Sequence, residues 1–109
     1  MVGYNEGVIQ SQNISQTIQY QESSVVSKEI VNNPMGTVTL FAFDKGQGLS
    51  EHSTPSRAFV TILEGRAEII VSGVEHEVKA GEMLPMPAGA PHALMAIEPF
   101  KMMLTMIKD

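Results

Sequence analysis

Short apolar runs separated by turn-forming residues recur along most of this chain. From residue 24 onward the runs are rich in β-branched and aromatic residues and are bounded by Gly, Pro, Asn, Asp or Ser, a pattern typical of β-strands. The expected strands are 24–32, 37–43, 48–54, 58–63, 66–71, 75–79, 83–86, 92–97 and 100–107. No stretch combines a helix cap with a sustained 3.6-residue period. The pattern therefore predicts an all-β fold, built as an antiparallel sandwich or closed barrel.

Two short turns and the polar start of the chain complete this outline. Glu64-Gly65 separates two apolar runs by two residues, so it predicts a tight hairpin. Ser72-Gly73 predicts a further turn. Residues 1–24 are rich in Gln, Ser and Asn. They predict either an arm or a short strand around residues 17–20.

Alternation of side chains indicates which faces point inward. In 75–79, three charged residues alternate with His76 and Val78, so these two face the interior. Strands 58–63 and 102–107 are instead apolar on both faces. Because an antiparallel sheet in one domain normally exposes one face to water, the second apolar face needs a cover. We expect a homodimer packed sheet to sheet, with coverage by the N-terminal arm as the alternative.

Length, charge and composition narrow the class of protein. A chain of 109 residues is one domain. It has no cysteine, which excludes disulfides and thiolate metal sites. The net charge is -5, with no basic stripe, so nucleic acid and anionic membranes are poor partners. The start lacks a secretory pattern, and no apolar run approaches the roughly 20 residues that span a bilayer. We therefore expect a cytoplasmic protein.

Two glycine-to-histidine blocks carry the candidate chemistry. The first is GQGLSEHSTPSRAFVTILEG, residues 46–65, and the second is GEMLPMPAGAPH, residues 81–92. Each places one histidine, His52 or His92, beside an apolar strand. Imidazole titrates near neutral pH and is the commonest metal ligand. The two histidines therefore predict a pocket between them, if the fold brings them together.

The two blocks resemble the two motifs of the cupin superfamily, of the small conserved-barrel (cupin 2) type. The motifs read G-x5-H-x-H-x3,4-E-x6-G and G-x5-P-x4-H-x3-N. The positions that match their spacing are Gly46, His52, Gly65, Gly81, Pro87 and His92. The resemblance covers about residues 37–107.

The resemblance implies a fold and a domain arrangement. The expected fold is a cupin-type jelly-roll β-barrel, also called a double-stranded β-helix, in a single domain and usually dimeric. Residues 1–36 would supply an N-terminal arm and the first strand or strands of that domain. Residues 37–109 would form the cupin barrel.

The departures from the motifs bear on the metal site that the resemblance implies. In a metal-binding cupin, two histidines and a glutamate from the first motif and one histidine from the second converge on the ion. Here Thr54 stands at the second histidine position and Ala58 at the glutamate position. Ala96 stands at the asparagine position of the second motif. His52 and His92 remain as candidate metal ligands, and the full three-histidine, one-glutamate site is absent.

Three readings of this incomplete site stay open. His52 and His92 can hold one divalent ion, with Zn, Ni, Fe and Mn not distinguished, and water in the remaining positions. A metal-free pocket can instead hydrogen-bond a small organic ligand through both imidazoles. The third reading is a purely structural dimeric barrel without catalysis. The two histidines are also candidates for acid–base chemistry on a small carbonyl or aromatic substrate, and the residues do not decide whether the protein is an enzyme.

Five further residues are candidates for lining the pocket: Thr54, Arg57, His76, Met83 and Met95. Arg57 is a candidate clamp for a carboxylate or phosphate at the barrel mouth, or a solvated loop charge. The methionines either line an adaptable pocket or fill the core. His76 faces inward, but we expect its strand at a sheet edge, away from the other two histidines.

Overall fold

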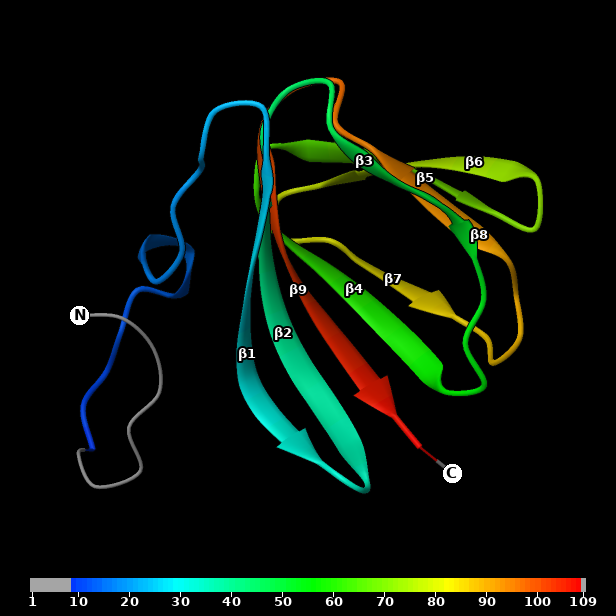
Figure 1. Cartoon of the computed structure of the whole chain (residues 1–109), viewed down its shortest axis with the longest axis horizontal. Coiled ribbons are helices and arrows are strands. Elements are labelled where there is room, and N and C mark those ends of the chain that lie inside the picture. The colour runs from blue at the N-terminus through cyan, green and yellow to red at the C-terminus, as the bar shows by residue number, and fades with distance from the viewer. Residues whose placement is uncertain (1–8, 109) are drawn as a thin grey trace.

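The computed structural model describes residues 9–108. In this range nine β-strands follow one 3-10 turn (Figure 1). The elements are η1 Ile14–Gln16, β1 Val25–Asn33, β2 Gly36–Phe43, β3 Gly48–His52, β4 Arg57–Glu64, β5 Arg66–Val71, β6 Val74–Lys79, β7 Met83–Met86, β8 His92–Met95 and β9 Phe100–Ile107. The prediction of an all-β chain is confirmed. No helix of the described residues is long and apolar enough to cross a membrane.

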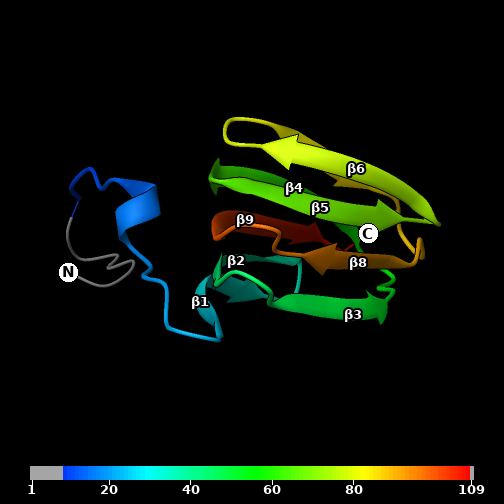
Figure 2. The same ribbon diagram turned by 90° about the horizontal axis from the view of Figure 1, so that it is seen from above.

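The strands form two antiparallel sheets that pack face to face. One sheet has the order β1-β2-β9-β4-β7 and the other has the order β3-β8-β5-β6. Figure 2 shows the four-stranded sheet as a layer in front of the five-stranded sheet. The many crossovers between the sheets make this a jelly roll, which confirms the predicted fold class.

The predicted hairpin at Glu64-Gly65 is wrong. β4 pairs with β9 and β7, whereas β5 pairs with β6 and β8, so this turn carries the chain from one sheet to the other. Both edges of β4 are already occupied, which leaves no edge for β5 to join. The predicted turn at Ser72-Gly73 is confirmed, and it joins the paired strands β5 and β6 with φ values of 49° and 81°.

The core fills the space between the sheets. Phe43 and Phe100 are fully buried there and stack with ring centroids 4.5 Å apart. Ile69 and Val78 are also buried, so the inward faces predicted from alternation for β5 and β6 are confirmed.

The N-terminal arm, which we define as residues 9–24, lies against the outer face of the five-stranded sheet. Ile18 is 4% exposed and packs with the buried residues Leu40 and Ala42 on that face. The arm contains η1 and no strand at residues 17–20. Of the two alternatives for this segment, the structure has the arm.

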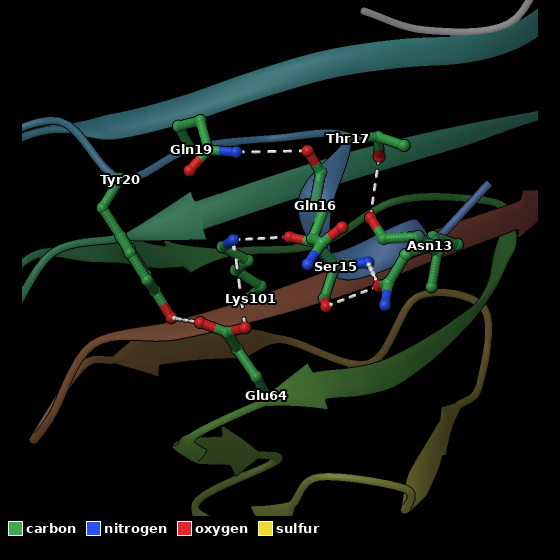
Figure 3. Close-up of polar contacts among 9 residues, drawn as sticks. Asn13, Ser15, Gln16, Thr17, Gln19, Tyr20, Glu64 and Lys101 are labelled. Atoms are coloured by element: carbon green, nitrogen blue, oxygen red, sulfur yellow. Dashed lines mark hydrogen bonds and ion pairs between the residues drawn. The ribbon is translucent and has the colours of Figure 1, made fainter. Parts of the chain in front are cut away.

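Polar contacts fasten the arm to the sheet (Figure 3). The Tyr20 hydroxyl donates to Glu64 Oε2 at 2.6 Å. The ammonium of Lys101, a buried residue, donates to the Ser15 carbonyl and lies 3.9 Å from Glu64 Oε1. The buried charge of Lys101 is therefore paired, as such burial requires.

Candidate functional site

The fold brings His52 and His92 together as a pair on neighbouring strands. His52 is the last residue of β3 and His92 is the first residue of β8. The two are register partners, and their rings meet edge to face with centroids 4.3 Å apart and an interplanar angle of 64°. We call these two residues the histidine pair.

A β-bulge in β3 places His52 on the inner face. Leu49 pairs with Leu94 and His52 pairs with His92, so three steps along β3 match two along β8. Simple alternation would put Leu49 and His52 on opposite faces. The extra residue reverses this, since a bulge re-aims the side chain that follows it. His52 therefore shares the inner face with Leu49 and with the buried residues His92 and Leu94.

Backbone hydrogen bonds orient both imidazoles. Nδ1 of His52 lies 2.8 Å from the Ser50 carbonyl oxygen, and Nδ1 of His92 lies 3.0 Å from the Ala90 carbonyl oxygen. Because a carbonyl oxygen only accepts, each Nδ1 carries the hydrogen. A neutral ring in this tautomer keeps its lone pair on Nε2. Each imidazole thus presents Nε2 as a base or a metal ligand.

Main-chain hydrogen bonds hold the loops next to the histidine pair. The N–H of Gly89 donates to the Thr54 carbonyl at 2.8 Å, and the N–H of Ser72 donates to the Pro91 carbonyl at 2.8 Å. His92 is 5% exposed, whereas His52 is exposed. The pair is therefore a rim site, with one buried and one accessible ring.

Two of the other candidate residues have different surroundings. The Thr54 hydroxyl accepts a hydrogen bond from the Ser56 N–H at 3.3 Å within the loop that follows β3. His76 pairs with Ile69 on the inner side of β6. Strand β5 separates β6 from β8 in the sheet order. The structure therefore does not bring His76 to the histidine pair.

The three remaining candidates lie on outer faces. Arg57 precedes the buried, inward-facing Ala58 on β4. Met83 is 54% exposed and Met95 is 43% exposed. Each of these methionines neighbours an inward-facing leucine on its strand, so it points the other way. These three side chains do not line the space beside the histidine pair.

The side chains that can coordinate an ion determine which kind of metal site this chain can form. Residues 9–108 contain no group of three or more His, Cys, Asp or Glu side chains placed to hold an ion. Ala58, at the glutamate position of the motif, has no ligating atom. The four-ligand cupin site therefore does not fit this chain. Two imidazoles with Nδ1 bound to carbonyls do fit as metal ligands, since such outer bonds orient ligating histidines.

Sequence reasoning missed the bulge, although one residue signals it. A Cβ on Gly48 would lie 2.3 Å from the Leu94 carbonyl oxygen. A glycine inside a strand often marks a bulge or a close backbone approach. Gly48 opens β3 and directly precedes the irregular segment, so a glycine at this position of the expected strand was the available signal.

The family model described as the Cupin domain matches residues 39–108. The chain therefore belongs to the cupin family, which confirms the resemblance of its two motifs. No curated protein matches it in sequence.

Solved structures of similar proteins share the whole fold. A conserved protein of unknown function from Streptococcus pyogenes is 35% identical with a TM-score of 0.91, and the match covers 100% of this chain and 96% of that one. A cupin superfamily protein from Desulfitobacterium hafniense is 23% identical with a TM-score of 0.90, covering 100% and 97%. A cupin 2 conserved barrel domain protein from Leptotrichia buccalis is 39% identical with a TM-score of 0.84, covering 86% of this chain and 46% of that one.

Proposed function

We propose that this small cupin binds one divalent transition-metal ion through Nε2 of His52 and Nε2 of His92. The observation that carries the proposal is that each Nδ1–H is engaged by a main-chain carbonyl, which leaves both Nε2 lone pairs available. Zn, Ni, Fe and Mn all accept imidazole nitrogen as a ligand.

The small number of protein ligands has a functional consequence. A tetrahedral ion held by two imidazoles keeps two positions for water or for oxygen atoms of a ligand. Sites with an open position are those that bind substrates, whereas closed four-ligand sites are structural. The proposed role is therefore a metal-dependent binding site for a small oxygen-donor molecule, and no reaction is assigned to it.

The test is zinc binding by untagged, chelator-treated protein, measured by calorimetry. We expect about one Zn²⁺ per chain, with ligand nitrogens at about 2.0–2.1 Å in a structure of the zinc complex. His52→Ala and His92→Ala should each weaken binding at least about tenfold. His76→Ala is the matched control, because His76 also faces inward but lies two strands away from His92. Equal losses in all three variants, or none, would contradict the proposal.

A second candidate is a metal-free pocket that hydrogen-bonds a small organic ligand. The absence of a third ligating side chain among residues 9–108 favours it. A ligand stabilises the folded state by RT ln(1 + [L]/Kd). If a small organic molecule raises the Tm equally with and without a chelator, and both histidine variants remove the effect, the pocket acts without metal.

A further inference from the structure

Side chains between the sheets become more exposed toward one end of the molecule. Along β2, Phe43 is fully buried and Phe41 is only partly buried. Along β9, Phe100 and Met102 are buried, whereas Leu104 and Met106 are partly buried. All six point between the sheets, because they belong to the same core cluster or pack against it. The sandwich is therefore closed at one end and open at the other, which we call the open end.

The histidine pair lies at this open end. Only residues 53–56 separate His52 from the start of β4. Ala58, near that start, pairs with Met106, and Met106 pairs with Thr37 at the start of β2. The partly exposed ends of β2 and β9 therefore lie at the same end as the pair. Figure 1 shows the two sheets diverging toward this end.

The inner walls at the open end are apolar and carry no positive charge. Phe41, Leu104 and Met106 lie on the five-stranded sheet, and Leu49 lies beside the pair on the other sheet. Glu29, the register partner of Thr39, lies on the inner face of β1. It is the one charged residue that the strand registers place on the inner faces of β1, β2, β3, β8 and β9. Glu29 is exposed on an edge strand and accepts a hydrogen bond from Asn32 at 3.1 Å. A carboxylate or phosphate entering here would meet no counter-charge from these walls.

We infer that the open end selects a small uncharged molecule with an apolar body and one or two adjacent hydroxyl or carbonyl oxygens. The oxygens would meet the histidine pair or its ion, and the body would lie against Phe41, Leu104 and Met106. This inference rests on the proposed function for the oxygen contact. The apolar contact is independent of the metal, because it uses other side chains.

The test uses three probes on the full chain with and without Zn²⁺, measured by calorimetry. Catechol and glycerol both offer adjacent hydroxyls, but only catechol has an apolar body. Benzoate has an aromatic body and a negative charge. We expect catechol to bind roughly tenfold or more tightly than glycerol, since each buried CH₂ contributes about 0.8 kcal/mol and 1.4 kcal/mol is tenfold. Benzoate should also bind more weakly than catechol.

Matched variants locate the apolar contact. Phe41→Leu should weaken catechol binding about threefold or more while leaving zinc affinity unchanged. Phe59→Leu makes the same change on the outer face of β4 and should leave catechol binding unchanged. A third variant, Met106→Lys, places a positive charge in the wall and should shift preference toward benzoate.

The outcomes separate this inference from the proposed function. Histidine-dependent zinc binding with no preference for catechol over glycerol, or with equal effects of Phe41→Leu and Phe59→Leu, would overturn the inference alone. Catechol binding that depends on Phe41, without any zinc binding, would overturn the metal proposal alone. Binding of neither zinc nor catechol would overturn both.

Discussion

At the scale of single residues, Gly65 has a steric reason for its place in the first motif. Its φ is 75°, and a Cβ there would lie 2.3 Å from the Pro99 carbonyl oxygen. Gly65→Ala should lower the free energy of unfolding by roughly 2–4 kcal/mol, because it combines a left-handed conformation with a backbone clash. Urea denaturation at constant m-value measures the loss.

Gly73 supplies the control for this prediction. It has a similar φ of 81°, but no atom lies within 4 Å of its Cβ position. Gly73→Ala should therefore cost only the conformational part, about 1 kcal/mol. If the two variants lose equal stability, close approach to Pro99 is not what makes Gly65 necessary.

The histidine pair shows what residue spacing reveals and what it leaves out. The motif spacing identified His52 and His92 because glycine turns and histidines recur at fixed separations. It did not reveal that a bulge is needed to turn His52 inward, since a bulge depends on how β3 pairs with β8. The outer-face positions of Arg57, Met83 and Met95 likewise follow from strand pairing, which spacing alone does not specify.

At the scale of elements, strand positions were predictable and sheet membership was not. Seven of the nine strands match the expected ranges within one residue at each end, and β3 and β8 end two residues early. Turn-forming residues and the alternation of apolar and polar side chains determine where each strand begins and ends. The turn between β4 and β5 was wrongly predicted to be a hairpin. A two-residue turn has the same sequence signature whether the next strand joins the same sheet or the facing sheet.

The contact between the arm and the five-stranded sheet predicts a pH dependence of stability. Burial raises the pKa of Tyr20 above its ordinary value, and the hydrogen bond to Glu64 raises it further. The folded state therefore holds a proton that the unfolded chain releases near pH 10. By linkage, the stabilisation is complete below about pH 10 and is lost as pH rises above it.

Tyr20→Phe tests this linkage. At pH 7 the variant should be less stable by about 1 kcal/mol, the net contribution of a typical hydrogen bond. The difference from the wild type should shrink between about pH 10 and 11, because the wild type alone loses the phenol proton. Denaturation series at fixed pH values measure both curves. A constant difference up to pH 11 would mean that Tyr20 does not contribute to the alkaline loss.

At the scale of the whole molecule, the arm leaves part of the outer apolar face uncovered. It packs over Leu40 and Ala42. Farther along the same face, Met83 is 54% exposed and Ile107 is 39% exposed, beside the half-buried Phe59. An apolar face of this kind favours association with a second copy. We therefore expect a homodimer that packs through the five-stranded sheets.

Light scattering after size exclusion tests the dimer at micromolar concentration. The wild type should have twice the 11.8 kDa mass of one chain. Phe59→Glu should give a folded monomer, because it buries an unpaired charge at the centre of the expected interface. Ile97→Glu, at a residue 52% exposed beside the four-stranded sheet, should remain dimeric. If Ile97→Glu alone dissociates the protein, the copies associate through the four-stranded sheet. A wild-type monomer would mean that the arm alone covers the outer apolar face sufficiently.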